Sequence, residues 1–162
     1  MSDVSGNFQA LLPVPFGRLG VRTSGGLLDE IVFLKTGATL APLDATAERV
    51  CAQIARYLED PEFRFDLPIP PRGTPFQQRV WKKIAAIPPG GTRSYGEIAR
   101  DLGSAPRAVG QACGANPIPL VVPCHRVLAA AGLGGFAHRE RGFYLSVKLW
   151  LLEHEGTPAV ST

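Results

Sequence analysis

A cysteine followed directly by a histidine and an arginine, at positions 124–126, is the part of this sequence best suited to chemistry. A thiolate is a strong nucleophile, but a free thiol with a pKa of about 8.5 is only a few per cent ionised at neutral pH. A neighbouring base is therefore needed to raise the ionised fraction of Cys124. His125 could take the proton directly or through a water molecule, and a carboxylate behind its imidazole would fix the tautomer.

Cys124 stands at the end of a run rich in proline and β-branched residues, Asn116-Pro-Ile-Pro-Leu-Val-Val-Pro. We expect this run to be extended and buried. Neighbouring residues on an extended strand point to opposite faces, so a direct bond between Cys124 and His125 would require a turn there. The residues alone nominate Cys124 as a nucleophile. They leave open a small core cysteine beside a surface histidine, and they do not name the electrophile.

Helical patterns flank this run and must position it. The stretch 74–87 begins with a capping box and a proline at the first helical position, and a Pro-Pro-Gly-Gly run ends it. The Ser-x-x-Glu box at 94–97 opens a short helix that ends at Gly103, and Pro106 begins another. Two such helices joined by a tight turn are typical of a helix-turn-helix, although many helical hairpins share the pattern. Residues 143–154 form the last predicted helix.

The first part of the chain has a different pattern. Residues 18–36 predict two short strands around a Ser-Gly-Gly turn. Residues 43–58 predict a helix, with this inward face: Ala47, Val50, Cys51, Ile54, Ala55 and Leu58. The proline-rich stretch 60–73 predicts an extended connector. We therefore expect an α+β protein with a small N-terminal sheet-plus-helix lobe (1–71, connector included), a mostly helical C-terminal lobe (72–157) and a tail (158–162).

Composition excludes several classes of protein. The chain has 162 residues, of which 45% are apolar and 19% charged, so it is neither disordered nor collagen-like. No apolar run reaches about 18 residues, so we expect no membrane span. The first residues lack the layout of a secretion signal, and three cysteines cannot pair completely, so we expect reduced thiols and a cytoplasmic location. The cysteine and histidine spacings predict no zinc site.

Charge is divided unevenly along the chain. Residues 1–71 carry six basic and nine acidic side chains, a formal charge of −3. Residues 72–162 carry eleven basic and five acidic side chains, a formal charge of +6. A basic second half suggests an anionic partner for that half, although a modest basic excess is often only a solvated surface.

The second half resembles a known family. The run Pro123-Cys124-His125-Arg126-Val127, preceded by Asn116-Pro117, is similar to the active-site signature of O6-alkylguanine-DNA alkyltransferases. The similarity extends through the stretches 90–99, 107–110 and 148–156, and so covers residues 74–156. In the N-terminal lobe the resemblance is only in outline, which in this family is ribonuclease-H-like.

This resemblance implies a function and a mechanism. Members of the family bind duplex DNA, flip out an alkylated guanine and take the alkyl group onto their own cysteine. Flipping is required because O6 is stacked inside the duplex. The resemblance implies a single turnover without a cofactor or a metal, because the cysteine is itself the acceptor. O6-alkylguanine in duplex DNA is the implied substrate, O4-alkylthymine is a possible second one, and we expect a monomer.

The resemblance also assigns roles at the reacting centre. Cys124 corresponds to the alkyl acceptor and His125 to the base that deprotonates it through a water molecule. Glu155 corresponds to the carboxylate that orients the histidine. Asn116 corresponds to the side chain that braces the turn beside the active-site helix. Arg126 resembles a buried structural cation with no catalytic role.

A second set of roles concerns DNA. Tyr95 corresponds to the residue that crowds the target phosphate and donates to the base, and Arg107 to the finger that replaces the flipped base. The carbonyl of Val127 corresponds to an acceptor for the guanine amino group. The second helix of the motif enters the minor groove in this family. Small residues along it fit close approach to DNA but would equally suit tight packing in a core: Ala108, Gly110, Ala112, Gly114 and Ala115. Cys113 and Cys51 are expected to pack inward without reacting.

The sequence departs from the family pattern after Gly132. The pocket wall there corresponds to Phe136 and Ala137, and a basic stretch, 138–142, follows. These changes affect the range of alkyl groups that the pocket would accept. The helix-turn-helix is also compact, as in some bacterial members, and we expect a bacterial protein.

Three other functions compete with alkyl transfer. A non-catalytic sensor of alkylation damage would share the fold, but such proteins lack the cysteine. A helix-turn-helix regulator without chemistry is the second, and a cysteine hydrolase that uses Cys124 and His125 is the third. The hydrolase would show turnover, and the sequence holds no oxyanion-hole motif that supports it.

Overall fold

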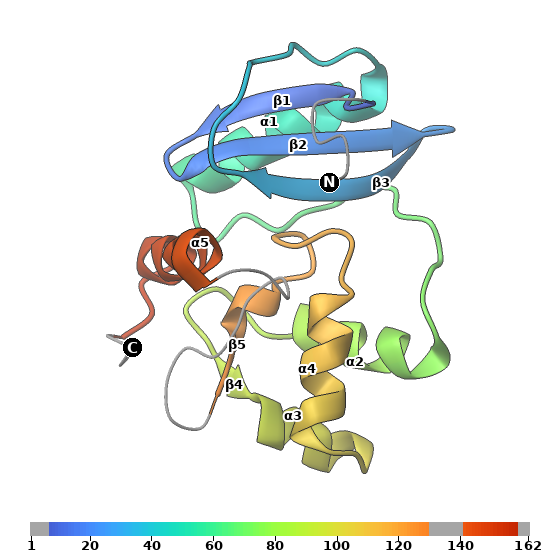
Figure 1. Cartoon of the computed structure of the whole chain (residues 1–162), viewed down its shortest axis with the longest axis vertical. Helices are drawn as coiled ribbons and strands as arrows, with labels where there is room; N and C mark the ends of the chain where they lie inside the picture. Colours follow the sequence, from blue (N-terminus) through green and yellow to red (C-terminus); the bar gives the residue numbers. More distant parts are fainter. Residues whose placement is uncertain (1–6, 130–140, 159–162) are drawn as a thin grey trace. The chain divides into compact units, whose positions relative to one another are not determined.

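The computed structural model describes residues 7–129 and 141–158, and it divides the chain into two units, 1–71 and 72–162 (Figure 1). The first unit contains a three-stranded antiparallel sheet in the order β1-β2-β3, built from β1 (Ala10–Val14), β2 (Gly17–Ser24) and β3 (Leu27–Leu34). Helix α1 (Ala45–Glu59) packs on this sheet. The α+β class expected from the sequence is thereby confirmed.

The two strands predicted around the Ser-Gly-Gly turn are confirmed as β2 and β3, but β1 was missed. Its sequence contains Pro13, which weakens a strand pattern but is tolerated on an edge strand. The predicted inward face of the first helix was partly wrong. Tyr57 is buried there, while Leu58 is half-buried and Ala55 is exposed, because the face that meets the sheet is rotated from the predicted one.

The connector is held by hydrogen bonds rather than by regular structure. It has no helix or strand over residues 60–73. The Gln53 side chain donates to the carbonyl of Asp66 at 2.9 Å and accepts from its N–H at 2.9 Å. Leu28 N–H donates to the carbonyl of Pro68 at 2.7 Å. These bonds hold the connector against α1 and β3 of the first unit.

The second unit contains four helices and a short pair of parallel strands among its described residues. Helix α2 (Pro75–Ala85) and helix α3 (Tyr95–Leu102) both begin with the predicted capping boxes, at Thr74 and Ser94. Helix α4 (Pro106–Gly114) follows, and α5 (Arg141–His154) is the last. Strand β4 (Arg93–Ser94) pairs with β5 (Val127–Leu128), which follows directly on the Cys-His-Arg run at 124–126.

The predicted helix-turn-helix is present as α3 and α4, which pack on each other. Gly103 ends α3 in the left-handed conformation, with φ 64°, as its predicted role requires. The indole N–H of Trp81 on α2 donates to the carbonyl of Ala112 at 2.8 Å. Helix α4 is therefore fixed from two sides within this unit.

The run before Cys124 is not extended as predicted. Leu120 has φ 80°, and Pro119 and Val122 form an isolated bridge around it, so the chain makes a tight turn. The sequence lacks a glycine at this turn, which explains why the pattern looked like a strand. No helix in the described ranges 7–129 and 141–158 is long and apolar enough to cross a membrane.

Candidate active site

Cys124 begins a short 3-10 helix, Cys124–Arg126, and its side chain is buried, with 3% of the residue exposed. This turn supplies the change of direction that an extended strand would not allow. The side-chain amide of Asn116 donates to Cys124 Sγ at 3.2 Å and to the carbonyl of Val122 at 2.9 Å. Its Oδ1 accepts from the N–H of Ile118 at 3.0 Å. One amide therefore spans the turn and fixes the sulfur.

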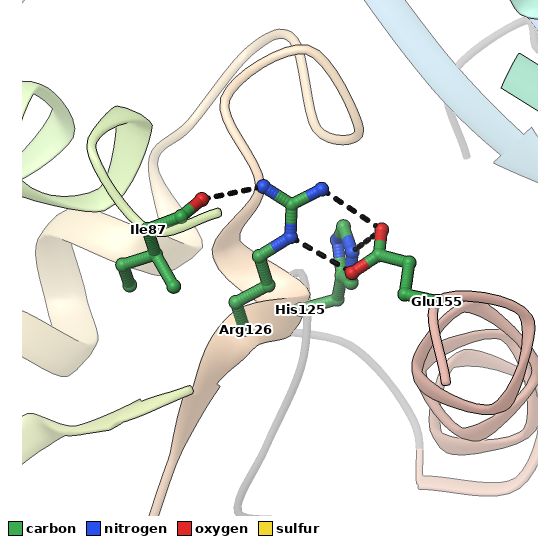
Figure 2. A network of polar contacts seen from close by, with 4 residues as sticks. All are labelled: Ile87, His125, Arg126 and Glu155. Atoms are coloured by element: carbon green, nitrogen blue, oxygen red, sulfur yellow. Dashed lines mark hydrogen bonds and ion pairs between the residues drawn. The ribbon is translucent and has the colours of Figure 1, made fainter. Parts of the chain in front are cut away.

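The two residues that follow Cys124, His125 and Arg126, form a buried network with Glu155 (Figure 2). His125 Nε2 lies 2.7 Å from Glu155 Oε2. Arg126 donates from Nε to Oε1 at 2.8 Å and from Nη2 to Oε2 at 3.0 Å. Its Nη1 donates to the carbonyl of Ile87 at 2.6 Å. The structure thus brings together His125 and Glu155, which are thirty residues apart in the chain.

The charge states follow from this burial. Burial lowers the pKa of His125, and the neighbouring Glu155 carboxylate opposes that shift. The net lowering keeps the imidazole neutral at pH 7, so it can accept a proton. When Nε2 donates to Glu155, the lone pair is on Nδ1, which is then the basic atom.

The sulfur itself is protonated at neutral pH in this environment. The adjacent Cys113 thiol and burial raise the pKa of Cys124 above its usual value. The Asn116 amide and the Lys148 ammonium act in the opposite direction. Forming the thiolate therefore depends on a base and on these two polar groups.

Lys148 is a site residue that the sequence did not predict. It is fully buried on α5, and its Nζ donates to the carbonyl of Val127 at 2.9 Å. Burial lowers the pKa of Lys148 to about 8, although the nearby Cys113 and Cys124 sulfurs favour its charged form. A signal was present in the sequence, because Lys148 occurs at helical spacing with Leu151, Leu152 and Glu155 on the buried face.

The residues expected to contact DNA lie on α3 and α4 of the second unit. Tyr95, at the start of α3, is half-buried. Burial raises the pKa of its hydroxyl, and the nearby Cys113 and Cys124 sulfurs act in the same direction, so it remains a hydrogen-bond donor. Arg107 is exposed near the start of α4, and Ala108 is half-buried. A Cβ built at Gly110 would lie 4.0 Å from Tyr95 Cε1, which places this part of α4 against the tyrosine.

The other predicted positions have mixed outcomes. Phe136 and Ala137, and most of the 138–142 stretch, lie outside the described residues. Cys113 is buried, as expected, whereas Cys51 on α1 is only half-buried. Within the described ranges, no group of three or more His, Cys, Asp or Glu side chains could hold a metal ion.

Comparison with known proteins gives the family. A family model described as "6-O-methylguanine DNA methyltransferase, DNA binding domain" matches residues 75–157. A methylated-DNA–protein-cysteine methyltransferase of Mycobacterium tuberculosis is 50% identical over 95 residues, which are 55% of this chain and 58% of that protein. The Mycolicibacterium paratuberculosis protein of the same name is 45% identical over 113 residues, which are 68% of this chain and 67% of that protein.

Solved structures agree with this result. A crystal structure of the Mycobacterium tuberculosis O6-methylguanine methyltransferase is 38% identical, with a TM-score of 0.76 and 94% of each chain covered. A structure of the same organism's protein in complex with DNA has a TM-score of 0.74 at 38% identity and covers 92% of this chain and 94% of that one. The match spans only 54–58% of the length of several curated relatives. Because the family model covers more than half of the sequence, this chain belongs to the 6-O-methylguanine DNA methyltransferase family.

Proposed function

We propose that this protein repairs alkylated DNA by moving the alkyl group from O6 of a guanine to Sγ of Cys124. The observation that carries this proposal is the buried Cys124 thiol, held by the Asn116 amide at 3.2 Å and followed directly by the His125–Glu155 pair at 2.7 Å. The arrangement has the three parts of an activated nucleophile: the atom that attacks, a neutral base, and a carboxylate that orients the base.

The first step is proton removal. His125 takes the thiol proton at Nδ1 through a bound water, and the resulting imidazolium donates from Nε2 to Glu155. The Asn116 amide and the Lys148 ammonium stabilise the sulfur anion, since both favour the ionised form of Cys124. Glu155 already neutralises Arg126 with two hydrogen bonds, so the carboxylate stays ionised and in place.

The second step is an in-line displacement at carbon. Sγ forms a bond to the alkyl carbon, the bond from that carbon to O6 breaks, and its electron pair goes to the guanine. The Tyr95 hydroxyl donates to the base and stabilises this negative charge. The guanine anion then takes up one proton, which balances the proton that the thiol gave to His125, so the products are a thioether at Cys124 and an unmodified guanine. A thioether does not release its alkyl group, so each molecule reacts once, without a cofactor.

Binding places the lesion at the sulfur. We propose that α4 enters the minor groove of duplex DNA and that Arg107 fills the space of the flipped guanine. The half-buried Ala108 and Gly110 support this arrangement, because small side chains let a helix backbone approach closely. The Val127 carbonyl would accept from the guanine amino group. The minor groove carries a degenerate base code, which suits a repair protein that must act in any sequence.

The proposal includes four further properties: the partner, the oligomeric state, the part of the chain that acts, and the location. We expect duplex DNA containing O6-alkylguanine as the partner, with O4-alkylthymine as a second substrate to be tested. We expect a monomer, which light scattering of the purified protein would check. We also expect residues 72–157 to carry both the DNA-binding and the acceptor functions, and a cytoplasmic location.

The test is the intact mass after incubation with duplex DNA that contains O6-methylguanine, in the presence of a reducing agent. We expect a gain of about 14 Da, one methyl group in place of a hydrogen, that saturates at one equivalent and maps to Cys124. Cys124→Ser should show no gain, and Cys51→Ser, with its change in the other unit, should react like the wild type. Tight binding to the lesion with an unchanged mass would instead indicate a damage sensor. Duplexes with O4-methylthymine form a second arm.

A further inference from the structure

The last turn of α4 receives a hydrogen bond from outside the helix. In a regular α-helix the carbonyl of Ala112 would accept from the N–H of Asn116, four residues later. Here the N–H of Asn116 donates to the carbonyl of Cys113 instead, at 3.2 Å. The Ala112 carbonyl accepts from the indole N–H of Trp81 on α2, at 2.8 Å. The indole therefore takes the place that the Asn116 N–H would have in a longer helix.

Trp81 is itself held by the segment that leads into α2. A Cβ built at Gly73 would lie 2.6 Å from Cζ3 and 2.7 Å from Cη2 of the indole, so the backbone at residue 73 packs directly on the ring. Gly73 has φ 89°, a conformation that favours glycine. The Gln78 side chain donates to the carbonyls of Arg72 and Gly73, at 3.2 Å each. The ring is therefore fixed by Gly73 and by its bond to α4.

The residue that leaves the helix here is the one that holds the nucleophile. The Asn116 side-chain amide donates to Cys124 Sγ at 3.2 Å and to the carbonyl of Val122 at 2.9 Å, and its Oδ1 accepts from Ile118 N–H at 3.0 Å. Pro117 disfavours a helical conformation at Asn116, but it does not decide which carbonyl binds the Asn116 N–H. That choice depends on what else binds the last turn of α4.

We propose that Trp81 is a positioning residue for the nucleophile, because its N–H releases Asn116 from α4 to bind the Cys124 sulfur. Without the indole N–H, the buried Ala112 carbonyl competes for the Asn116 N–H, since an unpaired buried carbonyl is costly. The side-chain amide is then drawn away from the sulfur. A hydrogen bond donated to a thiolate favours the ionised form, so its loss lowers the thiolate fraction at a given pH. The inference rests on Cys124 as the proposed alkyl acceptor.

The first test compares two variants of the whole chain without DNA. Trp81→Phe removes the donor, whereas Trp81→His keeps a ring N–H at a similar distance from the backbone, and both lose part of the packing. Peptide mapping follows the reaction of Cys124 with iodoacetamide from about pH 6 to about pH 10. In Trp81→Phe we expect the profile to move to higher pH by about 0.5–1 unit, the effect of one hydrogen bond. Trp81→His should keep the wild-type profile.

The controls separate this role from general destabilisation. Cys51, in the other unit, reacts in the same samples, and its profile should be the same in every variant. Trp150→Phe makes the same substitution at a half-buried tryptophan on α5, and the Cys124 profile should not move. Circular dichroism establishes that each variant is folded. Equal shifts in Trp81→Phe and Trp81→His would assign the effect to packing and overturn the proposal, as would an unshifted profile in Trp81→Phe.

A measurement on the wild type does not depend on how the Trp81 variants fold. The chain has two tryptophans, so its NMR spectrum contains two indole N–H signals, and Trp150→Phe assigns them. Alkylation of Cys124 by iodoacetamide displaces the Asn116 amide from the sulfur, so we expect the Trp81 signal to shift and the Trp150 signal to move less. An unchanged Trp81 signal would show that the sulfur and the end of α4 are not coupled.

The outcome is independent of the methyl-transfer experiment. If the Trp81→Phe profile shifts but O6-methylguanine DNA adds no mass to Cys124, the positioning role stands and the proposed function fails. If methyl transfer occurs but the profile does not shift, the proposed function stands and the role of Trp81 is refuted.

Discussion

The Glu155 carboxylate serves two buried partners at once. Arg126 binds both of its oxygens, and His125 shares Oε2. The guanidinium supplies the positive charge that a buried carboxylate needs, so His125 does not have to be protonated to satisfy it. Together with burial, which lowers the pKa of His125, this keeps the imidazole neutral and available as a base although it is hydrogen-bonded to a buried carboxylate.

Removing the negative charge of Glu155 should therefore affect both the stability of the fold and the rate of alkyl transfer. In Glu155→Gln, Arg126 stays buried without an anion, so we expect the free energy of unfolding to fall by about 3–5 kcal/mol. Alkyl transfer should also slow, because the imidazolium is no longer stabilised. Urea unfolding and single-turnover kinetics measure the two effects. The matched control is Glu153→Gln, an exposed acid in the last turn of α5 two residues before Glu155, which should change neither; equal behaviour of the two variants would contradict the assignment.

Stability should depend on pH through His125. Its pKa is lowered in the folded protein, so the unfolded chain binds the proton first, at about pH 6.5. The contribution of neutral His125 is complete above that pH and is lost as the pH falls toward the lowered value, with a slope of up to about 1.4 kcal/mol per pH unit. Urea unfolding between about pH 7.5 and about pH 5.5 measures this slope. His125→Asn should flatten it and His154→Gln should not; equal slopes in all three proteins would refute the prediction.

At the scale of the elements, α4 combines packing with proposed contact to DNA. Its buried side carries Val109, Ala112 and Cys113, while Gly110 faces the aromatic ring of Tyr95. A glycine in a helix interior costs about 0.5–1 kcal/mol relative to alanine. A glycine at position 110 would allow the backbone of α4 to approach the DNA groove closely, which offsets this cost.

Gly110→Ala tests that interpretation. The added Cβ would be 4.0 Å from Tyr95 Cε1, an ordinary contact, so we expect the free energy of unfolding to rise by about 0.5–1 kcal/mol. The affinity for duplex DNA should fall, because the methyl group separates the helix from the groove. Gly96→Ala on α3 gives the effect of the same change on stability elsewhere. An unchanged DNA affinity in Gly110→Ala would place the groove contact on another element.

Local signals predicted the helices well, and long-range pairing could not be predicted. The capping boxes at Thr74 and Ser94 and the stop at Gly103 fixed α2 and α3, because caps depend on neighbouring residues. Strand β1 and the turn at Leu120 were missed, since one is held by its pairing with β2 and the other by packing in the second unit. A leucine with positive φ has no sequence signature.

The site was predictable only in part for the same reason. Motif similarity nominated Cys124, His125, Asn116 and Glu155, which the structure brings together around the turn and the end of α5. Composition did not reveal that Arg126 also binds Glu155, or that the buried Lys148 donates to the carbonyl of Val127. These contacts join segments that are 29 and 21 residues apart, so helical spacing could indicate that Lys148 is buried but not which groups it contacts.

Over the whole molecule, charge is separated between the two units, −3 over residues 1–71 and +6 over residues 72–162. The proposed binding of DNA by the basic unit would release counterions, so the logarithm of the affinity should fall linearly with the logarithm of salt concentration. Arg107→Ala should lower the affinity for duplex DNA at every salt concentration, because the side chain proposed to fill the space of the flipped guanine is lost, and the exposed Arg64→Ala in the acidic unit should leave the affinity unchanged. Titrations at several salt concentrations measure the slope and both affinities; an unchanged affinity in Arg107→Ala would exclude Arg107 from the DNA interface.

Arg126 links the carbonyl of Ile87, 39 residues earlier, to Glu155, 29 residues later. During translation Arg126 leaves the ribosome before Glu155 does, by about 1–6 s at ordinary rates of synthesis, and Ile87 leaves earlier still. Until then the nascent chain has a guanidinium and an imidazole without the carboxylate that allows their burial. The turn at residues 124–126 can therefore reach its buried arrangement only after Glu155 has emerged. In a nascent chain that stalls before Glu155, the His125 and Arg126 side chains beside Cys124 lack the carboxylate that binds them.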